Sequence, residues 1–356
     1  MAINRRDFIK VAALAGLSWH TLATDMSGDQ QKRVLGVIKT ADGQWSAVCF
    51  DLTAGRVIYR IPLPGRAHGS ASVAHEVAAL VARRPGAFVI VFEPDTGRVI
   101  HRLKAPQGHV FNGHVVFTDH AMHVSGEKLG SSDGVLFHYE RKSWSLRDVV
   151  PLNGLGPHEI LLHSPDYLVA GIGGLRTAGR EVLNQNTMQP SLLCVHPVTG
   201  KEHWRLAPVD HLLSTRHLTL TDNGHAVIAM QYQSDIPQTL PLLAITDRPV
   251  DQQPQQLLPF EASDLDWMNF KNYIGSVASC GHQIVASSPR GHRVGVWDAS
   301  SRAFQYSDYI QDVCPLASDG QRWWAGSGVG LIRADDQTAS RQTGLRWDNH
   351  WSFIQF

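Results

Sequence analysis

Short apolar runs separated by turn residues recur along the chain from residue 34 onward. The runs are rich in Val, Ile, Leu and Phe, and Asp-Gly, Thr-Gly or Pro-Gly pairs stand between them. Apolar runs of this length, bounded by Gly and Asp, predict β-strands joined by tight turns. The pattern therefore indicates an all-β protein with almost no helix.

Three segments repeat one pattern, which is a strand, a glycine turn and a second strand. They span residues 50–60, 92–102 and 195–205. In the first two segments the turn glycines are Gly55 and Gly97, which are 42 residues apart. This spacing is about the length of one four-stranded propeller blade.

Extending that register predicts a seven-bladed β-propeller, formed by one domain over 34–356. The innermost strands are expected to begin near His68, His114, His158, His217, Tyr273, Val313 and His350. The chain enters the register at Val34 on a second strand, so a strand from His350 to Phe356 can complete the first blade. Such closure removes free sheet edges. The fifth blade is least regular, because 252–272 is polar, and a two-domain β-sandwich is the alternative.

Nineteen histidines are present, and five of them occupy the same position of the repeat. That position is the predicted start of the innermost strand, and the five residues are His68, His114, His158, His217 and His350. Innermost strands line the central channel, so the register predicts five imidazoles at one mouth. Polar loops joining second to third strands reach the same mouth, at 127–130, 176–189 and 287–293.

Three interpretations of these histidines remain open. Each ring can donate to a main-chain carbonyl of the next blade and fasten the blades together. Several rings can instead converge on a transition metal, because imidazole with carboxylate suits Fe, Cu, Zn or Ni. A third possibility is an anionic small molecule held by arginines and protonated histidines.

In the metal interpretation His114, His158 and His217 are the core ligands, and Glu159 supplies a carboxylate. His68 and His350 are further ligands or donors that support the core. The cofactor is one transition metal ion, iron or copper. Arg216 and Arg290 are the candidates for binding an anionic cofactor or a carboxylate-bearing partner.

No nucleotide cofactor is expected from the glycine-rich stretch at residues 171–174. The stretch follows a predicted strand, but no helix opens after it, so the dinucleotide fingerprint is incomplete. No motif for a quinone cofactor is present. Catalysis at the mouth, by a hydrolase or an oxidoreductase, therefore stays open without a named catalytic residue.

The first 25 residues are typical of an export signal. Paired Arg5 and Arg6 precede Phe8 and Lys10, a mildly apolar run follows, and Ala23 ends a small-residue cleavage site. This order resembles a twin-arginine signal, which predicts a periplasmic protein exported after folding.

Composition narrows the partners. Lys and Arg together number 32, as do Asp and Glu, so neither nucleic acid nor another polyanion is expected to bind. No apolar run is long enough to span a membrane, and we expect a monomer. The four cysteines form no CxxC motif, and Cys280 and Cys314 are predicted to be free.

Four short motifs carry a resemblance over the whole mature chain. They are the stretches Phe111–His114, Gly156–Glu159, Leu183–Leu192 and Leu213–Leu218. The chain resembles a bacterial family of uncharacterised, twin-arginine-exported seven-bladed propellers of the YVTN-repeat and quinoprotein amine dehydrogenase superfamily. The resemblance implies imelysin-like, iron-regulated periplasmic proteins as partners. The chain departs from the family at residues 125–128, where Lys128 is expected to place a cation beside any metal.

Together these observations predict a periplasmic propeller that binds iron or copper at a histidine-lined mouth and serves metal acquisition or handling. A metal-free scaffold that presents the same face to another protein is the first alternative. A hydrolase or oxidoreductase at that mouth is the second.

Overall fold

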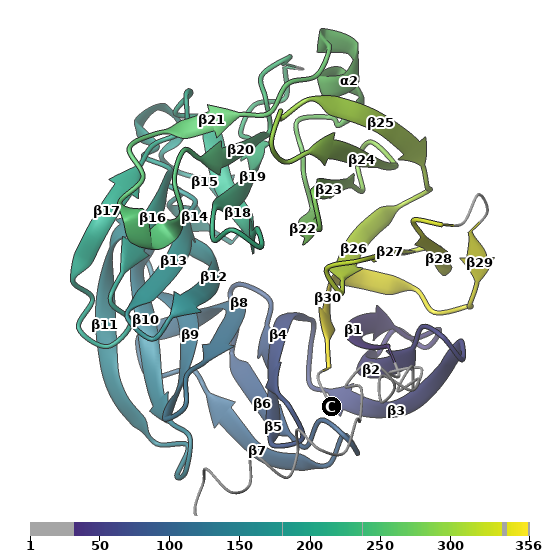
Figure 1. The fold of residues 1–356 in the computed structure, drawn as a ribbon. Helices are drawn as coiled ribbons and strands as arrows, with labels where there is room; N and C mark the ends of the chain where they lie inside the picture. Colours follow the sequence, from purple (N-terminus) through teal and green to yellow (C-terminus); the bar gives the residue numbers. More distant parts are fainter. Residues whose placement is uncertain (1–31, 180, 237, 337–339, 355–356) are drawn as a thin grey trace, which may run out of the picture.

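The computed structural model describes residues 32–354 except 180, 237 and 337–339, so the predicted export signal lies outside the described residues. Seven four-stranded antiparallel sheets follow one another around a central axis (Figure 1). The predicted all-β, seven-bladed β-propeller is confirmed.

Each blade runs from an innermost strand at the axis to an outermost strand at the rim. The first four blades are β30 (Trp347–Phe353), β1 (Arg33–Lys39), β2 (Trp45–Asp51) and β3 (Arg56–Leu63); β4 (Ala67–Val73), β5 (Val77–Ala82), β6 (Phe88–Phe92) and β7 (Val99–Lys104); β8 (His109–Phe117), β9 (Ala121–Lys128), β10 (Asp133–Glu140) and β11 (Leu146–Leu155); β12 (Pro157–Ser164), β13 (Tyr167–Ile172), β16 (Ser191–Val195) and β17 (Glu202–Leu206). The other three are β18 (Leu213–Leu220), β19 (Ala226–Tyr232), β20 (Leu243–Thr246) and β21 (Leu257–Pro259); β22 (Ser276–Cys280), β23 (Gln283–Ser288), β24 (Arg293–Asp298) and β25 (Phe304–Tyr309); β26 (Val313–Ser318), β27 (Trp323–Ser327), β28 (Leu331–Ala334) and β29 (Arg341–Gln342).

The ring closes in the first blade, where β30 pairs with β1 as predicted. Trp351 of β30 lies opposite Gly36 of β1 and is 6% exposed. A Cβ on Gly36 would lie 2.4 Å from Trp351 Cδ1, so only glycine leaves room for the indole there. Two strands more than 300 residues apart are thus held together by packing as well as by main-chain hydrogen bonds.

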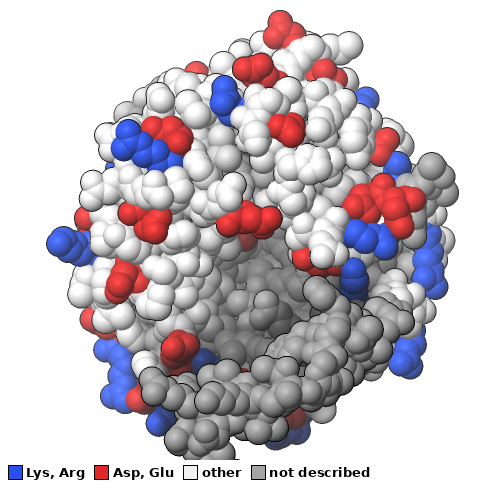
Figure 2. Space-filling model, in the orientation of Figure 1, with Lys and Arg blue, Asp and Glu red and all other residues white. Residues whose placement is uncertain are grey.

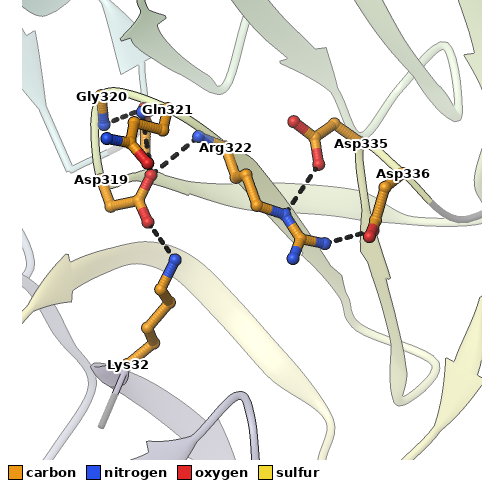
Figure 3. Close-up of polar contacts among 8 residues, drawn as sticks. Lys32, Asp319, Gly320, Gln321, Arg322, Asp335 and Asp336 are labelled. Carbon is orange, nitrogen blue, oxygen red and sulfur yellow. Dashed lines mark hydrogen bonds and ion pairs between the residues drawn. The ribbon is translucent and has the colours of Figure 1, made fainter. Parts of the chain in front are cut away.

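A polar network joins the seventh blade to the first (Figure 3). Asp319 lies in the turn between β26 and β27, where one oxygen accepts the main-chain N–H of Arg322 at 2.7 Å. Its other oxygen pairs with Lys32 Nζ, just before β1, at 2.5 Å. The Arg322 side chain pairs with Asp335 and Asp336 after β28. The turn at Asp319 therefore also ties the two blades together.

Few elements lie outside the blades. The insertion between β13 and β16 contains the short pair β14 (Thr177–Ala178) and β15 (Glu181–Val182) and a 3₁₀ turn, η1 (Gln185–Thr187). Around the fifth blade lie η2 (Val250–Gln252) and one short helix, α2 (Asp264–Asn269), whose first turn is capped by Ser263. The fifth blade is the irregular one, as expected, and its outermost strand, β21, has three residues.

The hydrophobic core lies between the blades, where neighbouring sheets pack face to face. The largest apolar cluster joins the fourth, fifth and sixth blades and includes Leu192, Ile228 and Trp297, all fully buried. Trp297 stacks on Trp267 of α2 with ring centroids 5.5 Å apart. This packing fixes each innermost strand at the axis.

The surface is mixed in charge. Over the coloured part of the face in Figure 2, Lys and Arg lie beside Asp and Glu rather than gathering into one basic patch. Within the described ranges, no helix is both long and apolar enough to cross a membrane. All four cysteines are free, as predicted for Cys280 and Cys314.

Candidate metal centre

Five imidazoles meet at the mouth of the channel. They come from the innermost strands of five consecutive blades, β30, β4, β8, β12 and β18, and they are the predicted residues His68, His114, His158, His217 and His350. Ring centroids are 4.5 Å apart for His68 and His350, and 4.4 Å apart for His217 and His350. We call these five side chains the histidine cluster.

Each of the five strands carries a β-bulge at or beside its histidine. The register shifts between Ala67 and Ser70, Phe111 and Val115, Pro157 and Ile160, Thr215 and His217, and Trp347 and Trp351. A bulge bends a strand and re-aims a side chain, and bulges are common beside active sites. The prediction that every histidine begins its strand is wrong for β8, β18 and β30, because strand pairing there continues past the bulge to His109, Leu213 and Trp347.

Many ring nitrogens of the cluster lack a hydrogen-bond partner within the protein. His68 Nε2 and His158 Nε2 are 3.2 Å apart. Within the cluster, four buried ring nitrogens have no hydrogen-bond partner among the described residues, and these are His68 Nδ1, His114 Nε2, His158 Nδ1 and His350 Nε2. Buried polar atoms normally find a partner. Fastening to main-chain carbonyls would satisfy these nitrogens, so their state does not fit that interpretation.

Two groups of three histidines can hold a metal ion. One comprises His68, His114 and His158, the other His114, His217 and His350, and in each group the three candidate ligand atoms lie within 4.8 Å of one another. Three atoms that close lie no more than about 2.8 Å from a common centre, whereas metal–imidazole bonds are about 2.0–2.1 Å. Each ligand nitrogen would therefore have to move by less than about 1 Å to reach bonding distance, which small ring rotations can provide.

The Glu159 carboxylate lies next to the Nδ1 atoms of two cluster histidines, His217 and His114. Its carboxylate is 3.2 Å from His217 Nδ1, 3.6 Å from His114 Nδ1, and accepts the Leu218 N–H at 2.9 Å. A carboxylate that accepts Nδ1–H fixes the tautomer and leaves Nε2 free to bind metal. Glu159 was predicted as a ligand, and its contacts instead suit it to orienting His217 and His114.

The cluster is electrically neutral at neutral pH. Burial lowers the pKa of all five imidazoles, and neighbouring rings or Arg216 add to the effect. The pKa of His114 and that of His217 each fall to about 3. Since metal binds the unprotonated ring, the site is held in its ligating form. Burial also raises the pKa of Glu159.

The two remaining blades bring different side chains to the same level. Cys314 lies in the corresponding bulge of β26, between Val313 and Leu316. Burial, and then the charges of Asp348 and Asp312, raise the pKa of its thiol, so the thiol is protonated at neutral pH in the metal-free protein. Tyr273 precedes β22 and also faces charged groups of the mouth. The donor set is therefore dominated by nitrogen.

The two predicted arginines are placed differently. Arg216, next to His217, is buried, and its charge acts on His158 and His217. Arg290 lies on the loop between β23 and β24, with its guanidinium 4.3 Å from the centroid of the Tyr273 ring. Arg290 has no contact with the histidine cluster. Lys128, expected beside the metal, is exposed on the last position of β9.

The sequence-based expectations gave no individual role to the polar side chains that brace the mouth. Asn112 is fully buried, and its Nδ2 donates to Glu127 Oε2 at 2.9 Å and to Pro157 O at 2.7 Å. Glu127 also pairs with Arg84 at 3.5 Å. These contacts hold the third blade against the residue before His158. An Asn-Gly pair inside an otherwise apolar strand was the available signal, because it marks a bulge.

Changing Glu159 to glutamine tests its orienting role. Glu159→Gln keeps the shape but loses the charge that receives the Nδ1–H groups, so metal affinity should fall by about 10- to 100-fold. Competition with a chromophoric chelator measures this affinity. Glu181→Gln, an exposed change on β15, is the control. An unchanged affinity in Glu159→Gln would contradict the role.

Seven four-stranded blades around a histidine-lined mouth define this chain as a β-propeller with a candidate metal centre. It belongs to the DUF1513 family, described as a protein family of unknown function, whose model matches residues 61–354 and so includes the whole histidine cluster. The resemblance to an uncharacterised family is confirmed to that extent.

Other comparisons address the fold alone. No curated protein matches the chain. Among solved structures it is similar to hydrazine synthase of Kuenenia stuttgartiensis, with 13% sequence identity and a TM-score of 0.61, over 91% of this chain and 99% of that chain. At this identity the likeness shows a shared propeller fold and does not define a function.

Proposed function

We propose that this protein binds a transition metal ion, iron or copper, in the histidine cluster. The observation that carries the proposal is the convergence of five neutral imidazoles with four buried ring nitrogens that lack a partner. A metal bound in one of the two groups would give ring nitrogens of that group a partner. Imidazole ligands suit Fe, Cu, Zn and Ni, and a donor set of histidines argues against an iron–sulfur cluster.

The protein would serve metal acquisition or handling in the periplasm. That part rests on the twin-arginine pattern of residues 1–25 and on the implied imelysin-like partners. A fixed site that holds an ion in neutral nitrogen ligands at neutral pH suits capture and transfer of metal between envelope proteins.

Metal content tests the proposal directly. The mature protein, purified from the periplasm without a His-tag, should contain about one equivalent of Fe or Cu by inductively coupled plasma mass spectrometry, as for one ion shared by imidazoles. The double variant His114→Ala/His158→Ala should contain none. His101→Ala/His120→Ala, which removes two exposed histidines, is the matched control.

A single result would refute the metal function. If the wild-type protein holds no metal above background and takes up no added Fe, Cu or Zn, the cluster is not a metal site. The metal-free scaffold would then be the remaining interpretation of this face.

A further inference from the structure

Arg216 is a buried cation without an acidic partner of its own. It lies in the bulge of β18 directly before His217 and is 7% exposed. Its Nε has no hydrogen-bond partner, and no carboxylate of a described residue forms an ion pair with its guanidinium. Gly173, just after β13, makes room for it, since a Cβ there would lie 3.3 Å from Arg216 Nη1.

Glu127 is the carboxylate whose charge acts on Arg216, and it already has other partners. Glu127 pairs with Arg84 at 3.5 Å and accepts a hydrogen bond from Asn112 at 2.9 Å. The Arg216 guanidinium is a cation at neutral pH, as arginine side chains in proteins are. A buried charge with no partner is costly.

A bound metal would worsen this imbalance. The charge of Arg216 acts on both His158 and His217, which belong to different three-histidine groups. A divalent ion, the Arg216 guanidinium and the Glu159 carboxylate would leave a formal charge of about +2 in a buried site. A small anion placed between the ion and the guanidinium would offset that charge.

We infer that Arg216 binds a small oxyanion, a carbonate or a carboxylate, that is at the same time a ligand of the metal in the histidine cluster. The cargo of the mouth is then a metal–oxyanion pair rather than a bare ion. Guanidinium binds such oxygens through two parallel hydrogen bonds. The metal half of this inference rests on the proposed function, whereas binding of the anion to Arg216 does not.

Retention of a labelled anion tests the inference. Protein stripped with EDTA is equilibrated with copper chloride at pH 7.5, in sealed dialysis cells containing either ¹⁴C-bicarbonate or ¹⁴C-citrate. The wild-type protein should retain about one label per copper with at least one anion, and Arg216→Gln at least about ten-fold less. Label from bicarbonate identifies a free oxyanion, and label from citrate identifies a carboxylate chelate as the cargo.

Two further variants separate binding from folding. Arg102→Gln, an exposed change on β7, should retain the wild-type amount. Arg216→Lys keeps a cation, which protects the fold, but it cannot make paired hydrogen bonds, so its label should also fall by about ten-fold. Circular dichroism confirms that each variant is folded.

The results distinguish failure of the anion inference from failure of the metal function. Copper bound without label in the wild type, or equal label in wild type and Arg216→Gln, overturns the anion inference and leaves the metal function standing. If no copper binds, the metal function fails, and the same cells report on the metal-free protein. Label retained by wild type and lost in Arg216→Gln would then support the anion site, and no label in either would overturn it.

Discussion

His114→Ala should lower the affinity for copper or iron more than any other single histidine change. The expected loss is on the order of 100-fold or more, above the usual effect of removing a residue that only hydrogen-bonds a metal ligand. The reason is that His114 belongs to both three-histidine groups. Its loss leaves only two pairs, His68 with His158 and His217 with His350. Isothermal titration with the metal-free protein measures the affinity.

The other single changes provide the contrast. His68→Ala leaves the group of His114, His217 and His350 intact, and His350→Ala leaves the other group, so each should cost only about ten-fold. His101→Ala, an exposed change on β7, should have no effect. Equal losses for all five cluster histidines would instead mean that one ion binds all of them, contrary to this prediction.

Acid should destabilise the metal-free protein steeply between pH 7.5 and pH 5. The folded pKa of His114 and that of His217 are about 3, whereas an unfolded histidine has a pKa of about 6.5. Below pH 6.5 the unfolded chain therefore binds more protons, and stability falls as the pH falls. Each of these two histidines should contribute about 2 kcal/mol to the loss at pH 5. Urea unfolding across this range measures it.

Replacing one cluster histidine by a neutral residue measures how much that histidine contributes to the loss of stability in acid. His114→Gln cannot be protonated, so its free energy of unfolding should fall by about 2 kcal/mol less than that of the wild type over the same range. His123, fully buried on β9 with a pKa of about 4, adds a separate contribution that this variant retains. The raised pKa of Glu159 works in the opposite direction. Parallel curves for wild type and His114→Gln would show that His114 is not held neutral.

Most of the fold could be predicted because a propeller repeats itself. The 42-residue spacing of Gly55 and Gly97 places two equivalent hairpin turns, and the same register locates the remaining blades. Closure through β30 followed from the chain entering at a second strand. The short β21 and the helix α2 could not be placed, since packing of Trp267 on Trp297, rather than a local pattern, decides where that segment lies.

The site was predictable in its residues but not in their roles. Equivalent positions on innermost strands must meet at the axis, so five histidines in register had to converge. The bulges depend on pairing with neighbouring strands and leave little trace in one sequence. The position of Glu159 behind His217 and His114, and the engagement of Glu127 by Arg84, depend on contacts between blades that the repeat does not encode.

Ring closure also sets when the histidine cluster is complete. His350 and His68 are 282 residues apart in the chain, and they meet only after β30 has docked between β26 and β4. Contacts of such long sequence separation form late and slowly in folding. A chain with six finished blades would still lack one side of the cluster. The group of His114, His217 and His350 would therefore be complete only in molecules whose ring has closed, and an ion bound there would slow the ring from reopening.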